Sequence, residues 1–371
     1  MSTWMRVPGS EEGALAALRR LLGDLLEKGL VDALLVPRPA PGGGNLVQVL
    51  VDNADALADA DPVAPVMPVQ SARILSALTA GGAPYRLGAV LKPCEVRATV
   101  ELAKLKQVDL ERLVLIGVDC LGTYEPREYS ALVAGGHDPT AHALATAAAG
   151  TVGPIAGAAF RDACRMCEQP SPQGCALRVA VLGTGGVVLI SGSQDLLDAL
   201  GYPQAEEPAA RGAALAALVA ERTATRDRML GEVRERLHDT AGLLAEFGRC
   251  IRCLNCMTAC PICYCKECIF RSATFDHPPA AYQGWLQRHG ALRLPADTVL
   301  FHLTRLNHMS ASCVGCGVCS SACPNGLPVA QVFRAVGREV QALFDYVPGR
   351  SVDDELPLAV FREDELGDVA K

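Results

Sequence analysis

The chain has 371 residues, which is enough for two or three domains around a sizeable core. Half of the residues are hydrophobic and 20% are charged, a composition typical of a globular protein and not of a disordered one. The formal net charge of −7 argues against general binding to nucleic acid. No run approaches the roughly 18 to 20 apolar residues of a membrane span, and no apolar leader follows Met1, so we expect a cytoplasmic protein without a membrane span.

Residues 1–205 show the pattern of an α/β domain. A strand, a turn, a helix and a second strand within about thirty residues predict a βαβ crossover, and therefore a parallel sheet. Apolar periodicity and Pro/Gly punctuation predict the elements in chain order. They are a helix over 11–28, strands over 31–36 and 46–51 around a loop at 37–44, a helix over 71–80, a strand over 87–91, a loop at 92–95, a helix over 96–106, a strand over 113–118, and two short strands within 176–191.

Beyond residue 205 the pattern changes three times. Residues 206–247 are rich in Ala, Leu, Arg and Glu at helical spacing, which predicts a long helix or a helical pair that links two cysteine-bearing regions. Residues 248–345 hold most of the cysteines and form the third predicted region. Residues 346–371 are acidic and contain proline, as expected of a surface tail.

Eleven of the sixteen cysteines lie between Cys250 and Cys323, mostly at short spacings that suit metal ligation better than disulfides. The pattern C-x2-C-x2-C-x3-C-P occurs twice. It is the repeat of a bacterial-type dicluster ferredoxin, in which three cysteines of one run bind a cubane and the fourth crosses to the other. We therefore predict one [4Fe-4S] cluster on set I and another on set II, where set I is Cys250, Cys253, Cys256 and Cys323, and set II is Cys260, Cys313, Cys316 and Cys319.

Two glycines in the second run, Gly315 and Gly317, agree with this prediction, because a residue without a Cβ lets backbone N–H groups approach the sulfurs. The alternative is a structural zinc ribbon. Zinc takes four ligands in two pairs, so the third closely spaced cysteine and the proline of each run favour iron.

The α/β region holds the other five cysteines. Cys94 and Cys120 each follow a predicted parallel strand and should meet at the carboxyl edge of the sheet, where α/β folds bind their ligands. With Cys164 and Cys167 they form set III, which would complete a third cubane. The alternative is that Cys94 and Cys120 are ordinary buried cysteines. Cys175 receives no role.

Three cysteines just beyond the first run, Cys263, Cys265 and Cys268, exceed what two clusters need. Either they ligate a further group, with a ligand supplied by a partner, or they are thiols that surround a cluster without binding it. The histidines, His302 and His308 among them, fit no metal-binding spacing and are expected to be structural.

These motifs together resemble the beta subunits of coenzyme F420-dependent formate dehydrogenases and hydrogenases. The resemblance covers roughly residues 30–345. It rests on the segments Leu91–Ala98 (LKPCEVRA), Gly117–Cys120 (GVDC), Cys164–Glu168 (CRMCE), Tyr264–Cys268 (YCKEC) and Leu303–Met309 (LTRLNHM), together with the double ferredoxin motif.

The resemblance implies an oxidoreductase subunit that is active within a complex. It implies FAD in the α/β domain, clusters that pass electrons between the flavin and a partner catalytic subunit, and a soluble two-electron carrier such as F420. It also implies that the turn at 92–97 lies near the flavin, which makes Lys92, Glu95 and Arg97 candidate cofactor-binding residues. Formate oxidation itself would need a molybdenum or tungsten pterin in the partner.

The expected architecture is therefore an α/β flavin-binding domain (1–205), a helical linker (206–247), a ferredoxin-like α+β domain with two [4Fe-4S] clusters (248–345) and an acidic tail (346–371). The catalytic centre of such a chain is the flavin. Two alternatives stay open: a flavin-free, ferredoxin-like electron-transfer subunit, and a zinc-stabilised interaction module.

Overall fold

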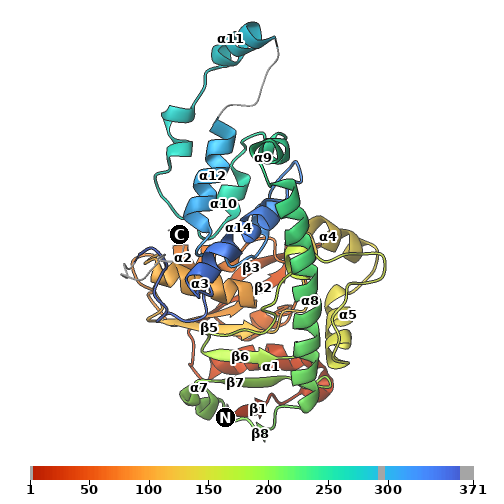
Figure 1. Cartoon of the computed structure of the whole chain (residues 1–371). Helices are drawn as coiled ribbons and strands as arrows, with labels where there is room; N and C mark the ends of the chain where they lie inside the picture. Colours follow the sequence, from red (N-terminus) through yellow and green to blue (C-terminus); the bar gives the residue numbers. More distant parts are fainter. Residues whose placement is uncertain (1–2, 291–296, 360–371) are drawn as a thin grey trace.

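A computed structural model describes residues 3–290 and 297–359. All its strands lie within the first 205 residues and form one eight-stranded sheet in the order β3-β2-β4-β5-β6-β7-β1-β8 (Figure 1). The strands are β1 (Trp4–Arg6), β2 (Ala33–Pro39), β3 (Leu46–Val51), β4 (Leu87–Leu91), β5 (Leu113–Val118), β6 (Leu177–Ala180), β7 (Leu189–Gly192) and β8 (Gln204–Ala205).

The centre of this sheet is parallel, as the βαβ pattern predicts: β2, β4, β5 and β6 run in one direction. Antiparallel strands flank the centre, so the sheet is mixed and the expectation of a parallel sheet is correct only for its middle. On one side β3 pairs with β2, and on the other β7, β1 and β8 complete the sheet. Strands β1 and β8 have three and two residues, too few for a periodic signal in the sequence.

The helices predicted over 11–28, 71–80 and 96–106 are confirmed within a few residues as α1 (Ala14–Glu27), α2 (Ser71–Leu78) and α3 (Pro93–Lys104). The α/β region also contains helices that were not predicted, namely α4 (Pro126–Ala134), α5 (Pro139–Ala148), α6 (Asp162–Arg165) and α7 (Gln194–Leu200), with 3-10 turns at Ser10–Glu12 and Asp55–Leu57. Beyond it lie α8 (Ala209–Arg236), α9 (Thr240–Phe247), α10 (Asn255–Ala259), α11 (Pro279–His289), α12 (Asp297–Met309), α13 (Val318–Ser321) and α14 (Val329–Leu343), with 3-10 turns at Ile269–Arg271 and Ala273–Phe275.

Helix α3 begins earlier than expected. The predicted loop at 92–95 is wrong, because Lys92 is the N-cap and Pro93 the first helical residue, a position that suits proline. The Glu95 carboxylate accepts hydrogen bonds from the backbone N–H of Lys92 (2.9 Å) and from the hydroxyl of Ser71 (2.5 Å). Cys94 lies between the capping residues Lys92 and Glu95. The cap therefore holds Cys94 in the first turn of α3, at the carboxyl end of β4.

Side chains on the two faces of the sheet pack in two different hydrophobic cores. On β4, Leu91 belongs to a core shared with α2 and α3, whereas the neighbouring Val90 points to the core under α1 and α5. The first of these cores continues without a break into the cysteine-rich region, where it includes Phe301 of α12 and Phe333 of α14. Figure 1 shows these helices stacked over α2 and α3. The cysteine-rich region therefore packs on the α/β region through a common apolar core.

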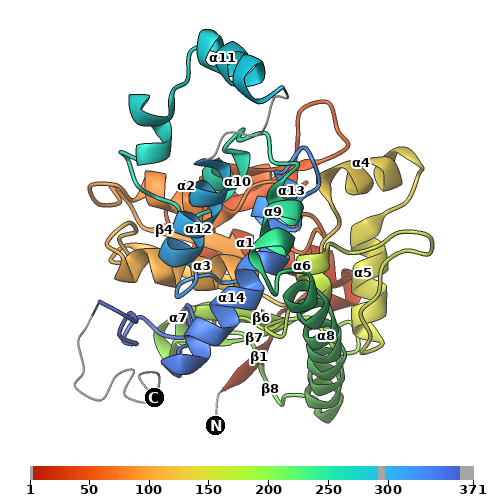
Figure 2. The same ribbon diagram turned by 45° about the horizontal axis from the view of Figure 1, so that its top comes forward.

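The helical pair predicted for 206–247 is confirmed as α8 and α9. Helix α8 runs along one side of the molecule, from the β8 edge of the sheet toward the cysteine-rich region (Figures 1 and 2). The α+β expectation for 248–345 is wrong, because the described part of that region is helical and contains no strand. The third cysteine of each run lies in a short helix, α10 or α13, and these two helices pack together.

The expected tail is not wholly on the surface. Tyr346 is buried, and its hydroxyl donates to the Glu101 carboxylate of α3 (2.5 Å), which also accepts the backbone N–H of Gly349 (2.7 Å). Gly349 has φ +73°, and a Cβ there would lie 2.3 Å from the carbonyl oxygen of Arg97. The segment is thereby fixed to α3. Residues 360–371 of the predicted tail lie outside the described part of the chain.

A buried ion pair joins the sheet to α8 and provides a stability test. Asp119, after β5, pairs with Arg211 (2.5 Å) and accepts the backbone N–H groups of Val181 and Leu182, with both charged side chains at most 3% exposed. We expect Asp119→Ala to lower the free energy of unfolding by about 3–5 kcal/mol, because Arg211 loses its buried carboxylate and keeps only the exposed Glu207 at 3.2 Å, and two buried N–H groups lose their acceptor. Asp59→Ala, in the exposed pair with Arg38, should cost about 0–1 kcal/mol. Equal losses in urea unfolding of the two variants would contradict this.

Candidate functional site

The four cysteines of set I line one cavity, although they come from two runs that start 63 positions apart in the numbering. Burial raises the pKa of the Cys250 thiol, and the nearby thiols of Cys253 and Cys323 raise it further. The pKa of Cys256 is raised by burial too, against the lowering effect of Arg305. The crossing of Cys323 into the first run is therefore what the structure favours.

Hydrogen-bond donors surround the sulfurs of set I. The Arg305 guanidinium lies 3.1 Å from the Cys256 sulfur, and a ring nitrogen of His302 lies 3.3 Å from the Cys250 sulfur. The backbone N–H of Leu327 points at the Cys323 sulfur at 3.4 Å. Donors of this kind stabilise thiolate ligands and tune the potential of a bound cluster.

The four cysteines of set II also lie close to one another. Burial raises the pKa of Cys316 to about 12, and the next cause is Cys260, the fourth cysteine of the first run. Cys260 also follows burial among the causes that raise the pKa of Cys313 and of Cys319. Cys260 therefore lies among the three cysteines of the second run, the reciprocal of the crossing in set I. The backbone N–H of Gly315 lowers the pKa of the Cys313 thiol, against the effect of burial.

The two glycines of the second run are required by their surroundings. Gly315 has φ +74°, and a Cβ on it would overlap the guanidinium of Arg334. Gly317 has φ +80°, and a Cβ would lie 2.2 Å from the Cβ of Ala163 in α6. Both residues combine a backbone conformation that favours glycine with a close neighbour. The second run is thus fitted against α6 and α14 with no room for a side chain.

The structure also brings set III together at the carboxyl edge of the sheet. Burial raises the pKa of Cys120 to about 11, and the thiols that act on it are Cys164 and Cys167. The pKa of Cys94 is likewise raised by burial, and then by the nearby Glu95, Cys316 and Cys120. These pairwise effects place all four thiols of set III around a common region.

Cys164 differs from the other buried thiols, because its pKa is lowered. Burial alone would raise it, but the guanidinium of Arg161 and the hydroxyl of Thr123, 3.0 Å from the sulfur, favour the thiolate. A thiolate is the form that binds metal. This environment makes an inert apolar cysteine the weaker of the two interpretations of set III.

Cys94 also connects set III to set II. Cys316 of set II is the first thiol among the causes that raise the pKa of Cys94. Arg161 bridges the same two sets, with its guanidinium 3.8 Å from the Cys164 sulfur and 3.4 Å from the Cys316 carbonyl oxygen. The three cysteine sets therefore form a row, III–II–I, that starts at the edge of the sheet.

Buried cations provide a test of whether clusters fit. Arg305, Arg161 and Arg222 are at most 4% exposed, and among the described residues none has a carboxylate within ion-pair distance. An uncompensated buried charge is costly. Arg305 acts on the thiols of sets I and II, and Arg161 and Arg222 act on those of set III. Anionic, thiolate-ligated clusters would supply the missing negative charge.

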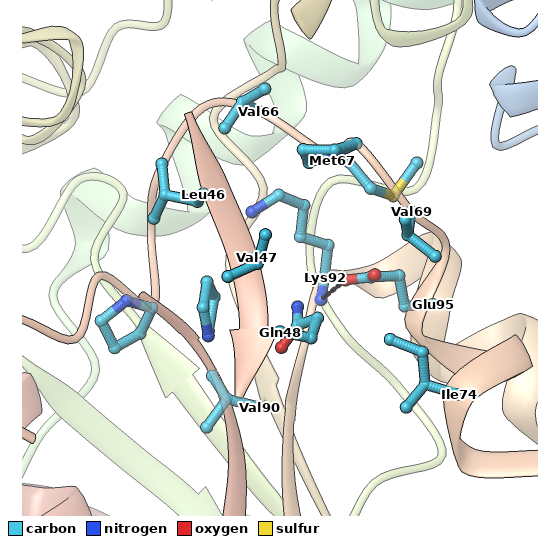
Figure 3. Close-up of a pocket in the computed structure, with 13 residues that line it drawn as sticks. Leu46, Val47, Gln48, Val66, Met67, Val69, Ile74, Val90, Lys92 and Glu95 are labelled. Carbon is cyan, nitrogen blue, oxygen red and sulfur yellow. Dashed lines mark hydrogen bonds between the residues drawn. The ribbon is translucent and has the colours of Figure 1, made fainter. Parts of the chain in front are cut away.

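A further pocket, of about 200 Å³, opens beside Lys92 and is called the edge pocket here. Its walls come from β2, β3, β4, α2 and the loop before α2, and they are mostly apolar. Figure 3 shows the Lys92 side chain between Val47 of β3 and the loop that carries Val66 and Met67. It lies beside the carboxyl end of β4, where α/β folds bind their ligands.

Two polar groups of the edge pocket are not fully compensated: Lys92 lacks a countercharge and Gln48 lacks a hydrogen-bond donor. Buried Lys92 donates to the Ala64 carbonyl oxygen (2.8 Å), and no described carboxylate lies within ion-pair distance of its ammonium. The side-chain oxygen of Gln48 is buried without a hydrogen-bond partner. A flavin ring offers N–H donors and, when reduced, a negative charge, so these groups fit it.

The predicted flavin residues do not all lie together. Lys92 and Glu95 line the edge pocket, although the Glu95 carboxylate is engaged in capping α3. Arg97 points elsewhere: its guanidinium donates to the carbonyl oxygens of Pro348 (2.8 Å) and Val314 (3.3 Å), next to set II. The structure thus places Arg97 with the cysteines of the ferredoxin motif.

The remaining cysteines fall into two groups. Cys175 packs under Gly117 of β5, where burial raises its pKa to about 11, and this is the setting of an apolar cysteine. Cys263, Cys265 and Cys268 line a wide groove between α2 and α12. Among residues 3–290 and 297–359, no group of three or more His, Cys, Asp or Glu side chains is arranged to hold a single metal ion.

Sequence reasoning missed the buried groups around the sulfurs. It treated His302 as structural, whereas the ring contacts the Cys250 sulfur, and it gave no role to Arg305, Arg161 or Thr123. The available signal was the segment 303–309, an arginine with apolar neighbours on a helix of the cysteine-rich region. Its meaning depends on which helix face meets the cysteines.

Comparisons with known proteins agree with this geometry. A family model described as a 4Fe-4S dicluster domain matches residues 246–327. The chain is 24% identical to the F420-dependent formate dehydrogenase subunit beta of Methanocaldococcus jannaschii, over 93% of each chain. It is 25% identical to the F420-dependent formate dehydrogenase 1 subunit beta of Methanococcus maripaludis, over 94% of this chain and 92% of that protein.

Among solved structures, one chain of the F420-reducing [NiFe] hydrogenase complex from Methanosarcina barkeri matches 62% of this chain and 92% of its own length. The TM-score is 0.44 and the sequence identity 11%.

Fold and motifs define an iron–sulfur oxidoreductase subunit, in which a 4Fe-4S dicluster region is joined to a mixed α/β domain. The relatives confirm the resemblance seen in the motifs: over nearly its whole length, the chain is similar to the beta subunits of F420-dependent formate dehydrogenases. None of the described helices is both long and apolar enough to cross a membrane.

Proposed function

We propose that this chain carries electrons between a flavin in the edge pocket and a partner catalytic subunit, through [4Fe-4S] clusters on sets III, II and I. The flavin is FAD, and it exchanges two electrons with a soluble carrier such as F420. Residues 1–205 form the flavin domain, 206–247 the helical linker and 248–345 the dicluster domain, with the segment from 346 fixed to α3. The relatives' names, which specify formate and F420, support this assignment.

The observation that carries the proposal is the continuity at the start of α3. Lys92 and Glu95 line the edge pocket, while Cys94 between them belongs to set III and lies near Cys316 of set II. A single helical turn therefore separates the pocket from the first cluster of the row. A short distance between neighbouring redox centres favours electron transfer between them.

A flavin, when bound, supplies the conversion between two-electron hydride chemistry and one-electron transfer to clusters. The residues of this chain prepare the site for it. Apolar side chains from β3 and α2 line the pocket. The Lys92 ammonium would favour negative charge on the ring system, and the free oxygen of Gln48 would accept an N–H.

The first test is the composition of protein purified without oxygen. We expect FAD together with about twelve irons and matching acid-labile sulfide per chain, since each cubane holds four irons. About eight irons with FAD would remove the third cluster from the proposal. About eight irons without flavin would leave a ferredoxin-like relay, and zinc in place of iron would end the redox assignment.

The carrier is tested on the same preparation. Reduced F420 and NADH are added separately, and flavin and cluster absorbance are followed. Bleaching by reduced F420 alone is the expected result, and bleaching by NADH alone would contradict the choice of carrier.

Lys92→Ala tests the edge pocket as the flavin site. We expect it to lower flavin content and to shift the flavin potential to more negative values, because the reduced anionic ring loses a buried cation. Iron content should stay unchanged. The matched control is Lys106→Ala, at a surface lysine outside the edge pocket. Wild-type flavin content and potential in Lys92→Ala would exclude Lys92 from the site.

A further inference from the structure

One buried cation, Arg305 of α12, faces two cysteine sets at once. Its guanidinium donates to the Cys256 sulfur of set I at 3.1 Å and to the Cys256 carbonyl oxygen at 3.2 Å. The other thiols that act on it electrostatically include Cys260 and Cys319, both of set II. Arg305 therefore contacts set I and lies close enough to set II for its charge to act on both.

The position of this guanidinium is enforced by aromatic packing. Its centre lies 4.8 Å from the Phe333 ring and 5.4 Å from the Phe301 ring, and the residue is 3% exposed. Cation–π contacts and burial hold the charge away from water, where its field is weakly screened. The side chain is thus fixed at a point where its charge acts on both sites.

Two other arginines near set II, Arg334 and Arg97, are already engaged by other groups. Arg334 forms an ion pair with the Glu168 carboxylate, and Arg97 donates to two backbone carbonyl oxygens. Arg305 has no carboxylate within ion-pair distance among the described residues, and its Nε has no hydrogen-bond partner. Its positive charge is therefore available to the cysteine sulfurs.

We propose that Arg305 is a positioning residue for electron transfer, which raises the reduction potentials of the clusters on sets I and II together. Reduction adds one electron, and thus one negative charge, to an already anionic cluster. A fixed cation at hydrogen-bond distance favours the reduced state, most strongly in set I and by charge alone in set II. This inference rests on the proposed function, because it requires both clusters.

The test compares Arg305→Gln and Arg305→Lys with wild-type full-length chain, all purified without oxygen. Redox titrations followed by electron paramagnetic resonance give the potential of each cluster. In Arg305→Gln we expect both potentials to become more negative, so that at a fixed ambient potential the reduced-to-oxidised ratio of the set I cluster falls about tenfold or more. Arg305→Lys should recover most of the set II shift and less of the set I shift, because lysine keeps the charge without the forked donor.

The matched control is Arg271→Gln, which changes an arginine of the adjoining groove that donates to the Thr258 hydroxyl. It should leave both potentials unchanged. Full iron content in Arg305→Gln with wild-type potentials would overturn the proposal. Loss of iron from both Arg305 variants would also overturn it, by assigning Arg305 a structural role. If the wild-type chain itself holds no iron, it is the proposed function that fails.

Discussion

Cys256→Ser and Cys323→Ser should each remove the same cluster, with a loss of about four irons per chain. The two cysteines belong to different runs, 67 positions apart in the numbering, yet they line one cavity. Because a cubane needs both, the double variant Cys256→Ser/Cys323→Ser should lose no more iron than either single variant. Iron analysis and the spectrum of the remaining cluster measure this.

The matched comparison uses Cys260, which follows Cys256 by four residues but lies with set II. Cys260→Ser should remove the other cluster, and Cys256→Ser/Cys260→Ser should remove both, about eight irons. If instead Cys256→Ser/Cys260→Ser loses only four irons, each run binds its own cluster and the crossing is wrong. Serine keeps the size of the side chain, so the effect reports on ligation.

Cys167→Ser should disconnect the flavin from the dicluster region. We expect the iron content to fall from about twelve to about eight, with flavin content unchanged, because set III lies beside the edge pocket without lining it. Electrons from a reduced flavin should then reach sets I and II at least tenfold more slowly. Stopped-flow absorbance after mixing with reduced F420 measures this step.

Cys175→Ser is the control, since Cys175 packs under β5 outside set III. It should retain both the iron and the transfer rate. If Cys167→Ser keeps twelve irons, set III is not a cluster. If it loses four irons but keeps the wild-type rate, set III lies off the electron path.

The local elements were largely predictable because their signals are local. The bounds of β3, β4 and β5 match the predicted strands exactly, since continuous apolar runs bounded by turn residues identify buried strands. The start of α3 was missed, because the sequence Lys92-Pro93-Cys94 reads as a loop unless Glu95 is known to cap it. Strand β1 pairs with the distant β7, and β8 pairs with β1. These two strands are therefore stabilised by pairing with distant segments, which their own short sequences do not reveal.

The partition of the ferredoxin cysteines was also predictable, because the spacing of thiolate ligands is a covalent property of the chain. The crossing of Cys260 and Cys323 follows from two copies of one motif. The all-helical character of 248–345 did not follow, since ferredoxin-like spacing leaves the connecting segments free to adopt any structure that buries their apolar residues.

The sequence by itself determined which thiols are candidates to bind iron, and to which proteins the chain is similar. Only the tertiary structure decided how the cysteine sets and the edge pocket lie relative to one another, because the contacts between them join residues far apart in the chain. The Cys94–Cys316 proximity, the separation of Arg97 from Lys92 and the contact of Arg305 with set I each depend on how α3, α12 and the second run pack in one core. Such packing arises from burial of apolar surface over the whole fold, and no short motif encodes it.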